Sequence, residues 1–334
     1  MSMNTSILNY AAKLMVLTMV FFTSCSDDEK ESGGIENSSP FPSLGITDPV
    51  TTIDYGGGVS TFNYVDGKMV GGYDYGYQEL DMTISYSPLS IKGYDAVIDE
   101  DYSSVFELIY SNIQTNSMGF ITSTDITVRE TEKENGGENY VDEEISHCTA
   151  QYNEDGYLVK MEINASYKED GVPCRTNRVI TREWSEGNLK SIHWYNADYE
   201  GDSDIPVEDP DDILIVFTYN DDAPKNNGIY LDEMIYDSDI VTYAGFWGKT
   251  TKCIPITSEI VLEEGGSNLK NYYTVDTDDK GRIVALYLNG LEYMRYGYAD
   301  QPLRTVSVKK NKSMKSRLIG KLHNGKREIL KLIK

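Results

Sequence analysis

The chain has 334 residues, with 30 Lys and Arg against 54 Asp and Glu and a formal net charge of −24 at pH 7. Such an acidic body repels phosphate backbones, which argues against nucleic-acid binding, and its length allows one large domain or two smaller ones. Tyr outnumbers Phe by 26 to 8. Because Tyr suits a sheet face that is apolar at its base and wet at its tip, this excess favours β structure.

The first 25 residues have the pattern of an export signal. A charge-free apolar run at residues 14–22 follows Lys13 and leads into Thr23, Ser24 and Cys25. The run is shorter than the roughly 20 residues that span a bilayer, and small residues precede Cys25, as cleavage requires. We therefore predict a lipoprotein signal peptide over residues 1–24, with an ordinary secretory signal as the alternative. Acyl chains such as palmitate on Cys25 would tie the chain to the lipid bilayer.

A flexible acidic tether is predicted next, over residues 25–45. It begins with a run of acidic residues and continues with Gly, Ser, Asn, Glu and Pro, a composition typical of a linker. The acidic run resembles the signal that sends Bacteroides-type lipoproteins to the outer cell surface. The expected location is therefore the outer membrane with the domain exposed at the cell surface; the periplasmic face is the alternative.

Residues 46–308 are predicted to form an antiparallel β meander. An aromatic or apolar residue, a short polar stretch with Gly and then an aliphatic residue recur, which is typical of β-hairpins. Arg182 and Glu183 are adjacent, so both faces of the sheet carry charge. We expect a water-soluble curved sheet, half-barrel or barrel with little helix. Residues 103–113 fit either a helix or a buried strand. The repeats occur at residues 64–69, 152–158, 184–189 and 275–283.

These patterns together resemble a family of Bacteroides lipoproteins of unknown function. The resemblance rests on the lipidation motif at Cys25, the hairpin at residues 62–73, the block at residues 217–228 and the segment at residues 273–298. It covers roughly residues 50–305 and implies a porin-like, up-and-down antiparallel β fold. The family brings no catalytic residue to carry over, and the basic tail from Lys309 departs from its pattern.

Three cysteines lie beyond Cys25, at positions 148, 174 and 253. The hairpins place Cys148 opposite Met161 and Cys174 opposite Tyr167. The two sulfurs would then lie about six residues, or roughly 20 Å, apart along the shared strand. Since a disulfide needs Cα atoms within about 7 Å, we predict that Cys148 and Cys174 are not bonded to each other.

Catalytic and metal-binding patterns are weak. The three His residues show no zinc spacing, and there is no nucleophile elbow or phosphate loop. We therefore predict no enzyme and no cofactor. Acidic residues spaced as in a calcium loop occur once, but Ser203 stands where an EF-hand needs Gly. A solvated acidic loop is the favoured interpretation. The carboxylates of this pattern are Asp198, Glu200, Asp202, Asp204 and Asp209.

Aromatic residues supply the candidate ligand site. Side chains of this kind can stack on sugar rings, although cross-strand pairs that stiffen the meander are the favoured interpretation. The candidates are Tyr73, Tyr75, Tyr77, Trp194, Trp247, Tyr296 and Tyr298.

A basic tail at residues 309–334 closes the chain, with Lys and Arg interleaved with Leu and Ile. It could form a further hairpin, lie on an anionic membrane or lie on the acidic body; a lightly docked or poorly ordered segment is the favoured interpretation.

Two functions follow from the whole sequence. The leading hypothesis is a membrane-anchored lipoprotein that binds a glycan or an apolar ligand. The alternative is a scaffold that presents its β domain to other envelope proteins.

Overall fold

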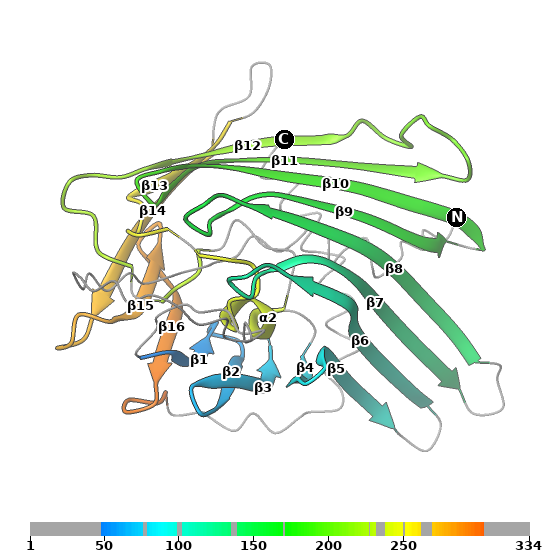
Figure 1. The fold of residues 1–334 in the computed structure, drawn as a ribbon, viewed down its shortest axis with the longest axis horizontal. Coiled ribbons are helices and arrows are strands. Elements are labelled where there is room, and N and C mark those ends of the chain that lie inside the picture. Colours follow the sequence, from blue (N-terminus) through cyan, green and yellow to red (C-terminus); the bar gives the residue numbers. More distant parts are fainter. Residues whose placement is uncertain are drawn as a thin grey trace, which may run out of the picture.

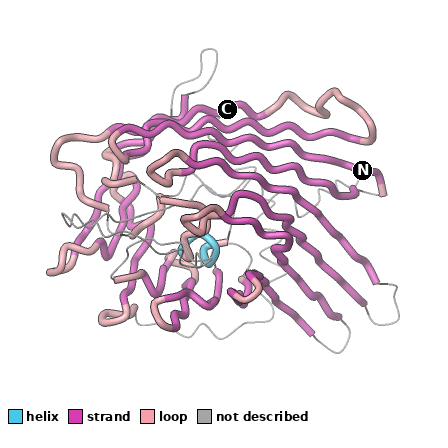
Figure 2. The backbone as a smooth tube through the Cα atoms, viewed as in Figure 1, coloured by secondary structure: helices cyan, strands magenta, loops and turns pink. Residues whose placement is uncertain are grey.

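The computed structural model shows a closed antiparallel β-barrel of sixteen strands (Figures 1 and 2). It describes residues 48–303 except 76–78, 99–101, 135–138, 170, 227, 232–237, 250 and 262–268. Each strand pairs with the next along the chain, and β1 (Val50–Asp54) pairs with β16 (Leu291–Tyr298) to close the ring. The predicted antiparallel β meander is confirmed, and it closes into a full barrel. The predicted signal peptide, the predicted tether and the basic tail lie outside the described residues.

The remaining strands differ greatly in length. Those from β6 to β11 have 12 to 14 residues, whereas the others have 5 to 10. Their bounds are β2 Val59–Val65, β3 Lys68–Asp74, β4 Leu80–Tyr86, β5 Leu89–Ile98, β6 Tyr102–Thr115, β7 Ile121–Glu134, β8 Asn139–Tyr152, β9 Leu158–Glu169, β10 Val172–Ser185, β11 Asn188–Glu200, β12 Asp211–Thr218, β13 Thr257–Val261, β14 Leu269–Thr277 and β15 Ile283–Leu288.

The hairpin turns follow from local sequence. Gly67 joins β2 to β3 with φ of 73°, and Gly187 joins β10 to β11 with φ of 80°. Such positive φ values are costly for residues with a Cβ atom, so these positions select glycine. The stretch at residues 103–113, which fitted both a helix and a strand, belongs to strand β6. Its alternate residues Leu108 and Tyr110 are buried, which is the two-residue period of a strand with one buried side.

The barrel has two different ends. One end carries the turns β2–β3, β6–β7, β8–β9 and β10–β11 together with the long connection between β12 and β13, residues 219–256; we call it the plug end. The opposite end, toward which β7, β9 and β11 run, is called the open end. Because β1 starts and β16 finishes at the plug end, the chain enters and leaves the barrel there.

Residues 219–256 form a plug inside the ring of strands. They include the short helix α2 (Asp239–Tyr243), which lies at the centre of the barrel in Figure 1. Side chains of Tyr230, Phe246 and Trp247 are at most 1% exposed. The backbone N–H of Ile121 donates to the carbonyl of Phe246 at 2.8 Å. The apolar core is therefore the contact between the plug and the inner faces of the strands.

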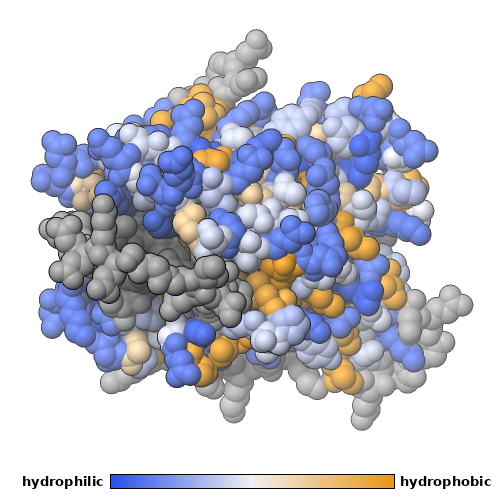
Figure 3. All heavy atoms as spheres, viewed as in Figure 1, coloured by the Kyte–Doolittle hydropathy of each residue, from blue (hydrophilic) through white to orange (hydrophobic). Residues whose placement is uncertain are grey.

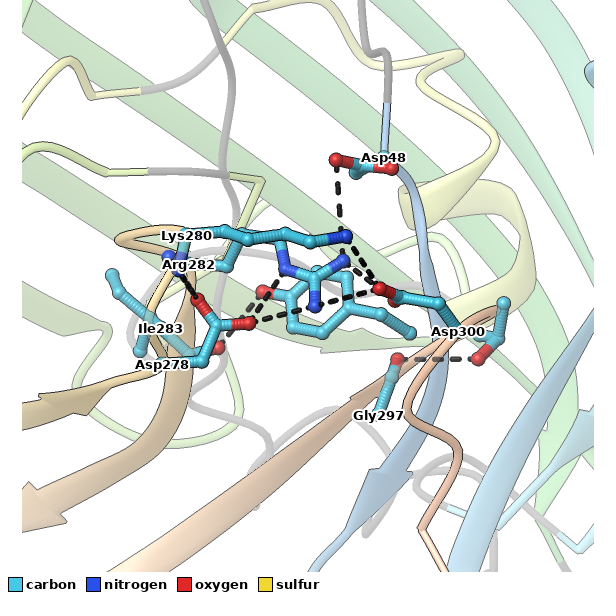
Figure 4. Close-up of polar contacts among 9 residues, drawn as sticks. Asp48, Asp278, Lys280, Arg282, Ile283, Gly297 and Asp300 are labelled. Carbon is cyan, nitrogen blue, oxygen red and sulfur yellow. Dashed lines mark hydrogen bonds and ion pairs between the residues drawn. The ribbon is translucent and has the colours of Figure 1, made fainter.

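Arg282 links chain segments at the plug end, close to the seam where β1 pairs with β16. Its guanidinium donates to Asp278 and to Asp300, each at 2.7 Å, and stacks over the ring of Tyr298 at 4.3 Å (Figure 4). A longer ion pair of 3.9 Å reaches Asp48, just before β1. One buried cation thus connects the β14–β15 turn with the segments that flank the first and last strands.

The outer face of the barrel is polar. Ion pairs cross it in the middle of long strands, for example Arg129 with Glu143 and Lys160 with Glu162, and hydrophilic residues cover much of the face seen in Figure 3. A bilayer-spanning barrel needs an apolar outer band about 25 Å tall. The outer face of the long strands therefore carries charged side chains, as predicted. Among the described residues, no helix is long and apolar enough to cross a bilayer.

The cysteine prediction holds, with one error of register. Within the part of the chain that the structure describes, Cys148, Cys174 and Cys253 form no disulfide. Cys174 pairs with Tyr167 as predicted, but Cys148 lies opposite Ile163 rather than Met161. One residue of the difference arises at the turn, where Tyr152 pairs with Leu158 and not with Tyr157, and the other from the bulge between Gln151 and Tyr152, which turn spacing does not reveal.

Candidate functional site

A polar cluster lies on the inner face of the long strands, toward the open end. Alternate residues of β8 and β10 face the barrel interior, since Cys148 and Ile180 belong to the apolar core. The next inward positions toward the open end are polar. We call this cluster the inner acidic face. It consists of Glu130 on β7, Asp142, Glu144 and Ser146 on β8, Thr176 and Arg178 on β10, and Trp194, Asn196 and Asp198 on β11.

Hydrogen bonds fix these side chains across neighbouring strands. Thr176 donates to Asp198 at 2.6 Å, and Arg178 donates to the amide oxygen of Asn196 at 3.1 Å. Both contacts join residues directly opposite in the β10–β11 ladder. Thr176, Arg178 and Asn196 are at most 7% exposed. The ladder thus presents a carboxylate, a guanidinium and an amide from one rigid surface.

Glu144 occupies the centre of the cluster. Burial raises the pKa of its carboxyl group; the hydroxyl of Ser146, which donates at 2.9 Å, and the charge of Arg178 lower it, whereas Asp142 and Asp198 raise it further. Burial also raises the pKa of Asp142. These couplings run from β8 to β11. Acidic groups of separate strands therefore act on one another.

Trp194 is the aromatic member of the inner acidic face. It is half-buried on β11 and pairs with Ile180 on one side and Ile213 on the other. The same strand carries Asn196 and Asp198 on the same side. An indole beside fixed polar groups offers an apolar surface and directed hydrogen bonds together. Of the seven aromatic candidates, Trp194 is the one that the fold places in this cluster.

Three of the other candidates are core residues. Trp247, Tyr296 and Tyr298 are each 1% exposed, and Tyr298 donates to the carbonyl of Ile283 at 2.8 Å. They therefore do not form the exposed stacking surface that was considered beside the favoured interpretation of cross-strand pairs. Tyr296 and Tyr298 do share a face of β16, but that face points to the core. Period two shows which residues share a face and not which medium the face meets.

The tyrosines near β3 do not form a platform either. Tyr73 ends up half-buried within β3, and Tyr75, just after the strand, is half-buried beside Tyr55 with ring centroids 6.2 Å apart. Tyr77 lies outside the described residues. Since β3 finishes at Asp74, the strand periodicity expected to align the three rings does not extend to Tyr75.

The calcium pattern does not gather into a site. Asp198 belongs to the inner acidic face, whereas Glu200, Asp202 and Asp209 are exposed. Asp204 instead binds Arg175 at 2.9 Å. Within the part of the chain that the structure describes, no group of three or more His, Cys, Asp or Glu side chains is placed to hold a metal ion. The favoured interpretation of a solvated loop agrees with this arrangement.

The histidines of the strands lie on the outer face. His147 contacts Asp125 at 2.7 Å and His193 contacts Asp212, and both imidazoles are about half exposed. They are well separated from the inner acidic face by the barrel wall. That face accordingly contains carboxylates, a guanidinium, an amide and an indole, a set suited to binding.

Sequence reasoning missed most of the inner acidic face. Asp142, Glu144 and Ser146 alternate along β8 on the side that continues into Cys148 and Ala150. This alternation could have predicted part of the site from the sequence, because carboxylates on the apolar side of a strand must lie in the interior of the barrel. The cross-strand partners from β10 and β11 required the register.

The fold and this cluster define a plugged antiparallel barrel with a polar inner face at one end. No protein-family model matches the chain, and no curated protein does so. Among solved structures, a porin-like protein from Bacteroides vulgatus is 14% identical, with 75% of this chain and 98% of that chain covered and a TM-score of 0.43. A porin-like protein from Bacteroides uniformis is 12% identical, with 63% and 95% covered and a TM-score of 0.25. The barrel assignment rests on the strand pairing itself.

Proposed function

We propose that this chain is a lipid-anchored protein of the cell envelope that binds a glycan on the inner acidic face. The observation that supports this proposal is the position of Trp194 beside Asn196 and Asp198 on one inward side of β11. The protein would act by binding, without catalysis and without a cofactor. An apolar ligand is disfavoured because the plug fills the apolar part of the barrel with its own side chains, such as Phe246.

Sugars match the chemistry of this face. Their hydroxyl groups can donate to the carboxylates of Glu144 and Asp198 and accept from the guanidinium of Arg178. The C–H face of a pyranose ring can pack on the indole of Trp194. Because the hydrogen bonds between β10 and β11 hold these groups before a ligand arrives, little side-chain entropy is lost on binding.

The anchor at Cys25 is the second part of the proposal. β1 begins at Val50 at the plug end, so a tether from Cys25 would join the barrel there. The open end, with the inner acidic face, would then lie on the side opposite the tether. A polar outer face fits a barrel held outside the hydrocarbon core. We place the protein at the outer membrane, exposed to the cell exterior, with the periplasmic face as the alternative.

Anchoring is tested by replacing the lipidated residue. Cells that express the wild-type chain or the Cys25→Ser variant are fed a palmitate analogue with a clickable group. We expect label on the wild-type chain alone, and loss of membrane association in the variant. A labelled Cys25→Ser chain would contradict lipidation at this residue.

Glycan binding is tested on an array of envelope and plant polysaccharide fragments. Trp194→Ala and Asp198→Asn should each weaken binding at least about tenfold, which corresponds to about 1.4 kcal/mol. Tyr195→Ala is the matched control, because Tyr195 lies next to Trp194 on the outward side of the same strand. A blank array, or equal losses in Trp194→Ala and Tyr195→Ala, would argue against the proposed site.

The alternative is an envelope scaffold that binds partner proteins. It is favoured by two exposed aliphatic residues on the outward side of β8, Val141 at 53% and Ile145 at 50% exposure. If the glycan array is blank while a Val141→Ser/Ile145→Ser variant loses a crosslinked envelope partner, the scaffold becomes the better function.

A further inference from the structure

Charges are segregated between the two faces of the long strands. The inner acidic face has Glu130, Asp142, Glu144 and Asp198, and Arg178 is its basic group. On the same strands, Arg129, Lys160 and Arg175 point outward, where each pairs with an outward or loop carboxylate. Most basic residues of these strands therefore lie on the solvent side, and the inner side, with Arg178 and the buried Arg182 of β10 as its cations, keeps an excess of negative charge.

This inner sheet surface continues to the rim of the open end. Glu132 is two residues beyond Glu130 on β7, and Glu200 is two residues beyond Asp198 on β11, so both lie on the inward side. Tyr102 donates to Glu132 at 2.5 Å, and Glu200 is exposed. Mutual repulsion of these carboxylates lowers the stability of the barrel unless positive charge compensates it.

The chain itself supplies such a charge in one segment. Residues 309–334 hold ten Lys and Arg and a single Glu, whereas the body before them is more acidic than the whole chain. Leu322, Leu330 and Leu332 alternate with these cations. A segment of this composition complements a sheet face that has carboxylates and an indole.

Its length also suffices. The last described residue, Leu303, follows β16 at the plug end, so the segment must travel along the barrel. Fully extended, residues 304–334 reach about 100 Å at roughly 3.3 Å per residue. A 14-residue strand spans about 46 Å at the same rise. The segment can therefore pass over the barrel end and reach the inner acidic face.

We propose that the basic segment 309–334 docks on the inner acidic face of its own barrel. Docking within one chain is favoured because the covalent link gives an effective concentration in the millimolar range. The docking does not depend on the proposed glycan function. Binding of the same segment to anionic lipid or to a second copy of the chain would be a different outcome.

Zero-length carbodiimide crosslinking of the full-length chain tests the docking. The reagent joins a Lys amine to a carboxylate in direct contact, and peptide mapping identifies the pair. At about 1 µM chain, far below the millimolar effective concentration, crosslinks within one chain dominate. We expect links from Lys321, Lys326 or Lys331 to Glu130, Asp142 or Asp198. Their yield should fall severalfold in about 0.5 M NaCl, where the Debye length is about 4 Å.

Matched variants complete the test. Asp142→Asn/Glu144→Gln removes inner carboxylates and should cut the tail crosslinks severalfold, whereas Glu143→Gln/Glu162→Gln removes outward carboxylates of β8 and β9 and should leave them unchanged. Tail crosslinks confined to the outer face, links between differently isotope-labelled chains, or no tail crosslinks would each overturn the proposal. Since no glycan is present in this experiment, its failure leaves the glycan test open, and a blank glycan array leaves the crosslinks unaffected.

Discussion

Arg282 carries a large predicted stability effect for a single polar side chain. We consider Arg282→Met, which keeps a long unbranched side chain and removes the charge. The side chains of Arg282 and Asp278 are each 5% exposed and lie 2.7 Å apart. Removing one partner leaves a buried carboxylate without compensation, which costs about 3–5 kcal/mol. Because Asp300 on the other side of the guanidinium is 48% exposed, we take the lower end, about 3 kcal/mol.

The expected shift is measured by thermal melting followed by circular dichroism. For a domain of this size each kcal/mol changes Tm by about 2 °C, so Arg282→Met should melt about 6 °C lower. Arg282→Lys keeps the charge but cannot bridge two carboxylates through a planar fork, and should lose roughly half as much. Arg295→Met is the control, since Arg295 and Glu292 form an exposed pair, and its Tm should be unchanged.

The pH dependence of the difference gives a second test. Burial acts to raise the pKa of Asp278, but hydrogen bonds and the charge of Arg282 outweigh it and hold that pKa below its ordinary value. Stabilisation by the pair is therefore present above about pH 4 and is lost as the pH falls through the folded-state pKa. The gap between wild type and Arg282→Met should be widest near pH 7 and shrink toward pH 2. Equal melting at pH 7, or a gap independent of pH, would refute the reasoning.

Three further predictions concern the plug and the thiols. Asp239 accepts hydrogen bonds from Tyr55 and Ser60 at 2.7 and 2.6 Å, and burial raises its pKa. Its contribution to stability is therefore lost as pH rises, and Asp239→Asn should match or exceed the wild-type Tm at pH 8. A clearly lower Tm of the variant at pH 8 would contradict a raised pKa. Asn226 donates to the carbonyls of Ile229 and Thr251, each at 3.1 Å, so Asn226→Ala should lower the urea-unfolding free energy by about 3 kcal/mol, while the exposed Asn177→Ala should not. Maleimide labelling of denatured, non-reduced chain should find Cys148, Cys174 and Cys253 unpaired; any quantitative pairing among them would argue against the barrel register.

Sequence and structure divide the evidence for function between them. The lipidation of Cys25, the signal peptide and the surface location are sequence predictions on residues outside the described part of the chain. The inner acidic face comes from the register of β7 to β11. The proposed function combines both kinds of evidence. The sequence suggests where in the cell the chain is located, and the barrel suggests which surface binds a ligand.

Local chemistry was enough to predict the meander. Gly67 and Gly187 mark turns because a positive φ is accessible to glycine, and alternation along segments such as residues 158–163 marks strands. These are effects between neighbours in the chain, so the sequence by itself determined the strand order, the scarcity of helix and the separation of Cys148 from Cys174.

Only the tertiary structure decided which side of each strand is inside. Closing β1 onto β16 turned Tyr296 and Tyr298 into core residues, and the plug placed Trp247 in the same apolar core. The ladders from β8 to β11 brought Glu144, Arg178 and Asp198 together from three strands, up to about fifty positions apart in the sequence. A period of two is identical for the inner and outer faces, so the choice between them depends on barrel closure and on what fills the barrel.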